Sequence, residues 1–422
     1  HIKDIKLHYQ NGWPDIDVLS GNMLFTGLGM DIMVDSGRYR DLEIGPTKVA
    51  IKRYDKPVLT IETDLNGSWM TQKQFILESP LKKKTGSFFR QLEVTGSTGL
   101  DLKLRIPLEG PVENGLKVDA HEKYPGNSVK LADWGLTAKN VSGKVRISEQ
   151  GVEASSLKGR LFDKPLTVSI KPIKKNKKRF ARIDVNATIN PLWSLNEEKV
   201  SLKKEIKGAS EWNLVFHVPD GSHSGESGGL TVSGKTDMKG LQIGLPAPLF
   251  KPSSEEQREL SFALEMRGPQ SLSIKGRLGR EITTDLHFVG KDLQQFERGE
   301  VRLGRGKARL PGSPGLHVIG RTELLDIDRW WSYIKDIETS KKQNSEADPL
   351  PLSRIDLTIG HLRLADQNYR DLAVDLQRRN YGWQVNLDNP DIKGRAKVPY
   401  PDFSNGTLEI SLERLRIQPS PD

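Results

Sequence analysis

The stretch Leu100-Asp-Leu-Lys-Leu-Arg-Ile-Pro-Leu108 places an aliphatic residue at every second position, with charged residues at 101, 103 and 105 between them. Side chains alternate between the two faces of a β-strand, so this stretch predicts a strand with one apolar and one charged face. Buried parallel strands read as continuous apolar runs, and the alternation is therefore typical of an antiparallel sheet. The pattern returns at Leu166, Val168 and Ile170; Ile183, Val185, Ala187 and Ile189; Leu272, Ile274 and Leu278; Leu286 and Phe288; Ile355, Leu357 and Ile359; Leu372, Val374 and Leu376; and Trp383, Val385 and Leu387.

Segments rich in turn-forming residues separate these runs and predict hairpins joined in a meander. They are Asn66-Gly67, Pro125-Gly126-Asn127, Ser142-Gly143, Glu149-Gln150-Gly151 and Asn405-Gly406. Helices are expected at 71–79, at 291–298 and, most strongly, from Asp326 to about Lys342, with Asp326 or Asp328 as the cap. We therefore predict an all-β fold: an elongated, curved and twisted antiparallel sheet that forms an open groove, with a few short helices.

The composition suits a thin, extended architecture. Of the 422 residues, 35% are hydrophobic and 28% are charged, which is little apolar material for a compact protein of this size. The formal net charge of +9 is a mild excess and is typical of a mixed, solvated surface. The sequence has no run of about 18 apolar residues and does not start with a signal peptide. We expect a piece of a longer protein.

Motifs for catalysis and metal binding are missing from the sequence. The lack of cysteine excludes a disulfide framework and a thiolate metal site. The eight histidines show no HExxH spacing, and neither a Gly-x-Ser-x-Gly elbow nor a phosphate loop occurs. The glycine-rich, basic segment 302–309 predicts a charged hairpin, because it lacks the strand-to-helix context of a phosphate cradle. We expect no enzymatic activity, no cofactor and no metal.

Two polar stretches give information about binding partners and about a possible domain boundary. Lys171-Pro-Ile-Lys-Lys-Asn-Lys-Lys-Arg179 predicts a basic hairpin tip. Only Phe180 supplies an adjacent aromatic ring, so we expect no nucleic acid there, and anionic lipid headgroups are the better partner. The Gly/Ser-rich stretch 220–229 predicts a flexible loop. We expect one continuous segment over 1–422, and the alternative is a subdivision into 1–219 and 230–422 around that loop.

Several motifs in the later half resemble a known family. Gly240-Leu-Gln-Ile-Gly-Leu-Pro-Ala-Pro-Leu-Phe-Lys-Pro252 is similar to the LPAPLxKP element of the AsmA-like YhdP family of Gram-negative bacteria. Leu325-Asp-Ile-Asp-Arg-Trp-Trp-Ser-Tyr333 is similar to the LDIDxWxxL segment of that family. Leu362-Arg-Leu-Ala-Asp-Gln-Asn-Tyr-Arg-Asp-Leu372 and Asp391-Ile-Lys-Gly-Arg-Ala-Lys-Val-Pro399 resemble its strand-turn-strand units. The resemblance extends over the whole chain and is most specific over 208–400.

The resemblance implies a function that composition does not. It implies a periplasmic segment of a protein anchored in the inner membrane through a helix outside this chain. Such a protein conducts phospholipids between the inner and outer membranes along a repeating β-groove, and it has no catalytic residues to carry over. The implied partners are phospholipid acyl chains and both membranes, whereas protein partners are not implied.

The candidate lipid-binding residues are aliphatic or aromatic side chains on the apolar face of the predicted strands. They are Leu102, Leu104, Ile106, Val168, Ile183, Val185, Ile274, Leu286, Phe288, Leu357, Val374 and Val385. On the residues alone, the alternative is that this face closes on itself as the core of a sandwich or barrel. In function, the alternative is a periplasmic or surface β-sandwich or solenoid that binds a glycan or protein. An outer-membrane barrel fits less well, because aromatic residues do not mark the strand ends regularly.

Overall fold

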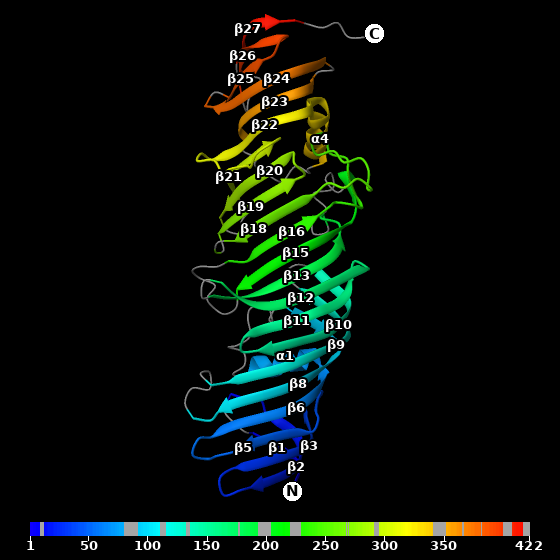
Figure 1. The fold of residues 1–422 in the computed structure, drawn as a ribbon, viewed down its shortest axis with the longest axis vertical. Coiled ribbons are helices and arrows are strands. Elements are labelled where there is room, and N and C mark those ends of the chain that lie inside the picture. The colour runs from blue at the N-terminus through cyan, green and yellow to red at the C-terminus, as the bar shows by residue number, and fades with distance from the viewer. Residues whose placement is uncertain are drawn as a thin grey trace. The chain divides into compact units, whose positions relative to one another are not determined.

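Two compact units make up the chain. The computed structural model describes residues 1–8, 12–79, 92–109, 115–131, 136–175, 178–192, 204–219, 229–266, 268, 270–290, 295–340, 352–364, 367–380, 382–399 and 407–416. The first unit comprises His1–Ile189 and Asn213–Glu226, and the second comprises Asn190–Trp212 and Ser227–Asp422. Figure 1 labels most of the elements of both units.

Antiparallel strands dominate the first unit. They are β1 (Ile2–Leu7), β2 (Ile16–Phe25), β3 (Met30–Tyr39), β4 (Leu42–Ile44), β5 (Thr47–Ile51), β6 (Val58–Ser68), β7 (Leu92–Thr95), β8 (Ser97–Pro107), β9 (Lys117–Leu131), β10 (Leu136–Ser148), β11 (Gly151–Leu161), β12 (Lys164–Lys175) and β13 (Lys178–Ile189). Most neighbours in sequence are neighbours in the sheet, while β4 and β5 both lie between β3 and β6, and β7 pairs with β9 beside β8. Strand β15 (Ser210–Pro219) contributes residues to both units.

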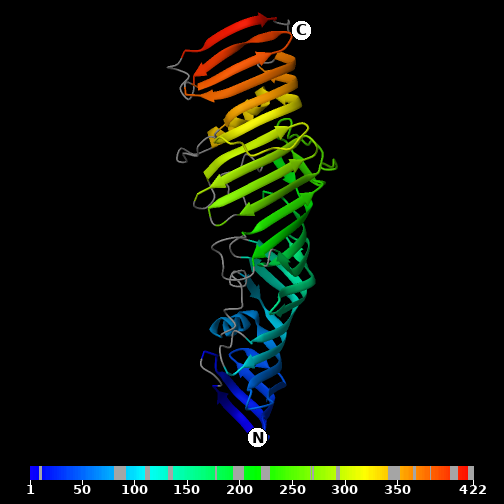
Figure 2. The same ribbon diagram turned by 60° about the vertical axis from the view of Figure 1, so that its left-hand side comes forward.

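The second unit carries a similar sheet and a small separate one. Its strands are β14 (Ile206–Gly208), β16 (Thr231–Thr236), β17 (Leu241–Ile243), β18 (Leu260–Met266), β19 (Ser271–Leu278), β20 (Ile282–Val289), β21 (Gln295–Leu303), β22 (Gly315–Asp326), β23 (Leu352–Leu364), β24 (Gln367–Arg379), β25 (Gly382–Asp388), β26 (Ile392–Pro399) and β27 (Glu409–Leu415). Strands β14 and β17 form the small sheet, and Figure 2 shows the strands from β18 onward side by side, yellow-green to red. The prediction of an all-β, mainly antiparallel fold is confirmed.

The two described helices lie where two of the three predicted helices were expected. Helix α1 (Trp69–Glu78) begins after Ser68, whose hydroxyl accepts a hydrogen bond from the backbone N–H of Thr71. Helix α4 (Ile327–Ser340) is capped by Asp326, whose carboxylate accepts from the N–H of Arg329 at 2.9 Å. The third prediction was wrong over its described part, because residues 295–298 form the start of strand β21.

Strand β22 departs from the expected meander. It pairs in parallel with β21 on one side and with β23 on the other. A parallel neighbour requires a crossover rather than a tight turn, and residues 304–314 and helix α4 occupy the two connections. The predicted charged hairpin at 302–309 was therefore wrong, because the chain there leaves β21 for a parallel strand.

Most of the predicted turns lie inside strands. Asn66-Gly67 is part of β6, Pro125-Gly126-Asn127 of β9 and Ser142-Gly143 of β10. The register of the β9–β10 pair shifts between Val141 and Ser142, so Gly126 and Gly143 mark a bulge in long strands instead of hairpin ends. Gly67 lies in a regular part of β6, opposite Thr98. The turn at 149–151 and the basic hairpin are confirmed, with Ser148 opposite Gly151 and Lys175 opposite Lys178. Asn405-Gly406 and residues 220–228 lie outside the described residues.

Candidate functional site

A line of apolar residues crosses ten strands of the second unit, one from each strand between β18 and β27. The cross-strand partners in order are Leu260, Leu278, Ile282, Leu303, Gly320, Leu357, Val374, Leu387, Gly394 and Leu412. We call this set the second-unit row. Since side chains alternate along each strand, the row lies on one face of the sheet. That face is the candidate site.

The predicted residues of the second unit share this face. Ile274 lies opposite Leu286, and Leu357 lies opposite Val374. Val385 belongs to the neighbouring cross-strand line, opposite Leu376 and Ala396. Phe288 follows Leu286 on β20, and its ring meets that of Phe296 edge-on, with centroids 5.4 Å apart. The structure thus places on one face of the sheet residues that are up to about a hundred positions apart in sequence.

A shorter line of the same kind crosses the first unit. Met23, Ile32, Val49, Ile61, Leu104 and Val118 are successive cross-strand partners from β2 to β9. Further along this unit, Val168 lies opposite Val185, and Ile183 lies opposite Ile170. Leu104, Ile106, Val168, Ile183 and Val185 therefore have apolar cross-strand partners, whereas Leu102 lies between Thr63 and Ala120.

Burial divides the predicted residues into two groups. Leu102, Leu104 and Ile106 are buried, and Ile106 is 0% exposed. They belong to a protein core that includes Trp13 and Tyr39. Leu357 is also buried, within a cluster of neighbouring strand residues. The remaining eight predicted residues are half-buried: Val168, Ile183, Val185, Ile274, Leu286, Phe288, Val374 and Val385. These eight are the predicted residues that keep part of their surface exposed.

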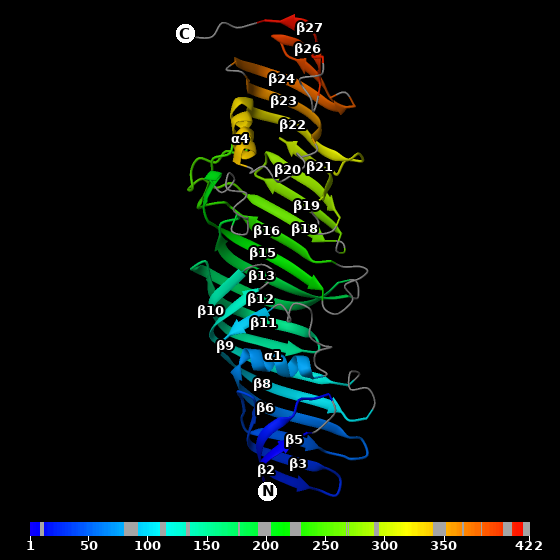
Figure 3. The same ribbon diagram turned by 180° about the vertical axis from the view of Figure 1, so that it is seen from behind.

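Helix α1 explains the burial around β8. Its residues Phe75 and Ile76 pack against the same core as Ile106, and the ring of Phe75 lies 5.3 Å from that of Tyr39. Figure 3 shows α1 lying across the strands of the first unit. Side chains fasten the helix at both ends: Gln72 donates to the carbonyl and hydroxyl of Thr98, and Tyr39 donates to Glu78 at 2.8 Å. The helix thus covers part of the apolar face.

A buried carboxyl group lies on the apolar face beneath α1. Glu122 is opposite Leu100 on one side and Val145 on the other, and it is 4% exposed. The hydroxyl of Thr98 donates to it at 2.9 Å. Burial raises the pKa of Glu122, and the hydrogen bond from Thr98 opposes this shift. Our sequence reasoning missed this residue, although the alternation through β9 would have placed it among apolar neighbours.

The segment 245–252 is held in place by buried polar contacts. Lys251 is fully buried, and its ammonium donates to the carbonyl oxygens of Leu241 and Ser253, both at 2.6 Å. Burial lowers the pKa of this lysine. The indole of Trp330 on α4 donates to the Ala247 carbonyl at 2.8 Å. These contacts join α4 to the segment, and its residue Leu249 packs against the core cluster that contains Leu357.

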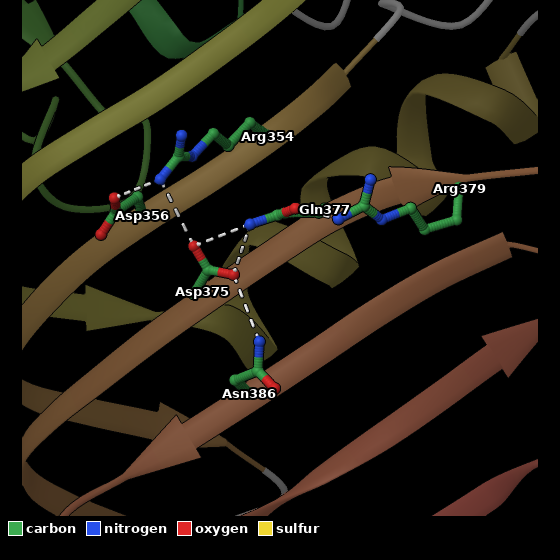
Figure 4. Close-up of polar contacts among 6 residues, drawn as sticks. All are labelled: Arg354, Asp356, Asp375, Gln377, Arg379 and Asn386. Atoms are coloured by element: carbon green, nitrogen blue, oxygen red, sulfur yellow. Dashed lines mark hydrogen bonds and ion pairs between the residues drawn. The ribbon is translucent and has the colours of Figure 1, made fainter.

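The opposite face of the second-unit sheet is polar. Asp375 accepts hydrogen bonds from Gln377 at 3.0 Å and from Asn386 at 3.3 Å, and the guanidinium of Arg354 lies 3.6 Å from it (Figure 4). Arg354 also donates to Asp356 at 2.8 Å. The two faces of the same strands therefore differ sharply in chemistry, as the alternation predicts.

Two features are absent from the residues that the structure describes. No three histidine or acidic side chains within these ranges gather to hold a metal ion. Neither described helix combines the length and the apolar character needed to cross a bilayer.

The fold and the apolar face define a class of protein: an all-β chain whose mainly antiparallel sheets carry apolar residues on one face. Comparison with known proteins is more specific. The sequence model described as "YhdP protein" matches residues 1–422, and the chain belongs to the YhdP family.

A curated relative carries a functional name. The intermembrane phospholipid transporter YhdP of Escherichia coli (strain K12) is 24% identical over 291 residues, which are 68% of this chain and 22% of the relative. The chain thus spans about a fifth of the length of that protein. No solved structure matches the chain.

Proposed function

We propose that this chain is a periplasmic segment of a bridge that conducts phospholipids between the inner and outer membranes. The acyl chains lie on the apolar face, in an open groove, and the headgroups stay in water. One observation carries the proposal: the second-unit row is apolar or glycine in every one of ten strands. Family membership and the name of the E. coli relative support it.

The energetics of a lipid in water explain why the row has to be unbroken. A phospholipid carries roughly 30 methylenes, and each one costs about 0.8 kcal/mol when it is exposed to water. A lipid that left a membrane without cover would thus face a cost on the order of 20 kcal/mol. A polar residue within the row would leave part of an acyl chain without apolar cover, and that part would again be exposed to water at the same cost per methylene. Half-buried residues such as Ile274, Val374 and Val385 provide the cover.

The same proposal includes where the bridge is anchored and which chemical groups transport requires. The bridge is anchored to the inner membrane through a segment outside this chain, and transport along a sheet needs no catalytic group, cofactor or metal. That residues 1–422 act as one continuous groove stays a prediction, as does the subdivision around 220–229. Leu102, Leu104 and Ile106 contribute to the protein core, so lipid contact in the first unit is expected at Val168, Ile183 and Val185.

Photo-crosslinking tests the proposal directly. A crosslinker replaces Val185, Ile274 or Val374 in turn, and the matched controls carry it one residue away, at Asp184, Lys275 or Asp375. We expect phospholipid adducts, identified by mass spectrometry after purification from cells, only at the first three positions. Equal labelling at both sets, or adducts at neither, would refute the groove.

The alternative is a binding module whose apolar face holds no lipid. It predicts purified protein without phospholipid, together with binding to a glycan or protein partner. Mass spectrometry of the lipid that copurifies with the protein separates the two functions before any crosslinker is introduced.

A further inference from the structure

Two neighbouring loops of the first unit expose four large apolar side chains. Leu24, Phe25 and Leu28 lie in and beside the β2–β3 turn and are 63%, 67% and 70% exposed. Tyr54, in the β5–β6 connection, is 48% exposed. The N–H of Tyr54 donates to the Leu28 carbonyl at 2.9 Å, so the two loops lie together. We call these four residues the tip. Monomeric proteins rarely expose such a group without a partner.

The backbone of the tip meets the main requirement for entering a membrane interface. Thr26 and Gly29 exchange backbone hydrogen bonds at 2.8 and 3.3 Å, and the Thr26 hydroxyl donates to the Gly29 carbonyl at 3.0 Å. These bonds pair the backbone N–H and C=O groups of Thr26 and Gly29 with each other. Unsatisfied N–H and C=O groups are costly in hydrocarbon, so this pairing lowers the cost of bringing the turn to a membrane interface.

The charges around the tip favour binding to an anionic surface. Lys52 and Lys56 flank Tyr54 in sequence and make no ion pair among the residues that the structure describes. Arg53 is bound to Asp55, with its Nε 2.8 Å from the carboxylate. A second acidic residue, Asp31, lies opposite Leu24 on β3. Two free cations beside aromatic and aliphatic side chains are the combination that anchors proteins at the surface of anionic bilayers.

The tip is also continuous with the apolar face. Phe25 lies opposite Met30, and the line continues through Ile51 and Leu59 to Ile106. An apolar line therefore runs from the exposed tip to the core of the sheet.

From these observations we propose that the tip docks on the surface of a phospholipid bilayer that contains anionic lipids. The aliphatic and aromatic side chains enter the interface, and Lys52 and Lys56 contact the headgroups. The inference goes beyond the proposed function, because the tip could attach to a bilayer whether or not the apolar face conducts lipid. Docking is therefore measured separately from transport.

Vesicle flotation tests the docking. The whole chain is mixed with vesicles of phosphatidylcholine containing phosphatidylglycerol, or of phosphatidylcholine alone. We expect binding to the anionic vesicles that weakens with salt, and a loss of about tenfold or more in the double variant Phe25→Asp, Leu28→Asp. Lys52→Gln with Lys56→Gln should remove the preference for anionic vesicles. The matched control is Phe162→Asp, which changes a 51% exposed ring between β11 and β12 and should bind as the wild type does.

A fluorescent label reports on the same contact. The chain has no cysteine, so Leu28→Cys and Phe162→Cys each give a single labelling site for an environment-sensitive dye. We expect anionic vesicles to shift the emission to the blue at position 28 and not at 162.

Three results would overturn the docking proposal. They are no flotation of the wild type, equal flotation of the Phe25→Asp, Leu28→Asp variant, and self-association through the tip without vesicle binding. Far-ultraviolet circular dichroism of each variant checks that it is folded. Lipid crosslinking at Val185, Ile274 and Val374 is measured separately, so failed docking with intact crosslinking would refute the tip alone.

Discussion

Asp356 on β23 lies directly opposite Asp375 on β24, and a single guanidinium, that of Arg354, contacts both carboxylates. Like charges at opposite positions of a sheet destabilise it unless a cation lies between them. We expect Arg354→Met to lower the free energy of unfolding by about 1 kcal/mol, because the pair is partly exposed to water. Urea unfolding measures the change. Adding Asp375→Asn should restore most of the loss, and an unchanged loss in the double variant would show that the repulsion is not its cause.

The buried part of β8 should be structural rather than lipid-binding. Ile106→Ala removes a fully buried side chain, and we expect it to lower the free energy of unfolding by about 3 kcal/mol. Val185→Ala, at a half-buried position, should cost about 1 kcal/mol or less. Chemical denaturation compares the two variants. Equal costs would contradict the division of the apolar face into a covered and an open part.

Glu122 should make the stability of the first unit depend on pH. Because burial raises its pKa, the folded chain holds the proton at pH values where the unfolded chain has lost it. The free energy of unfolding therefore falls as pH rises through this window, and it stays lower above the raised pKa. Glu122→Gln removes the titration and keeps an acceptor for the Thr98 hydroxyl. We expect this variant to be more stable than the wild type at about pH 8 and to lose the advantage at about pH 4.

Urea unfolding across this pH range measures the effect. The control is Glu62→Gln on the charged face, where the carboxylate is exposed and lies 3.4 Å from Lys103. A wild type and a Glu122→Gln variant with parallel pH profiles would refute the role assigned to the buried carboxyl group.

Gly320 should be required where β21 and β22 run in parallel. Its φ is +119°, and a Cβ at this position would lie 2.0 Å from the Leu303 carbonyl oxygen. We expect Gly320→Ala to lower the free energy of unfolding by about 2–3 kcal/mol. Gly312 has no atom within 4 Å of the equivalent position, so Gly312→Ala should stay within about 0.5 kcal/mol of the wild type. Thermal unfolding of both variants decides whether the strand contact is as close as described.

A charge on the second-unit row should expel lipid. Val374→Glu would place a carboxylate against the acyl chains, where its desolvation is costly. We expect several-fold less phospholipid to copurify with this variant. Ala373→Glu is the matched control, because the neighbouring residue is exposed on the opposite face of β24 and receives the same substitution. Equal losses in both variants, measured by quantitative lipid mass spectrometry, would argue against the row as the lipid path.

Much of the candidate site could be predicted because a strand carries its own periodicity. Ile274 and Leu286, or Leu357 and Val374, each belong to an alternating run, and pairing adjacent runs in a meander brings them together. The pairing of β22 and the packing of α1 over the apolar face were harder to predict. The parallel pairing of β22 depends on two crossovers, and the sequence 302–309 reads equally well as a hairpin. The turns expected at Pro125-Gly126-Asn127 and Ser142-Gly143 became bulges, because a glycine in a strand marks either feature.

The sequence by itself determined that this is an all-β protein with one apolar and one polar face on its strands, since the period of two is a local property of the backbone. Only the tertiary structure decided which apolar residues are open. Helix α1 packs against the core that contains Ile106, whereas Val185 is half-buried, and two loops place Leu28 and Tyr54 side by side at an exposed tip. Alternation specifies the face on which a side chain lies, whereas its exposure depends on segments that pack over that face from elsewhere in the chain.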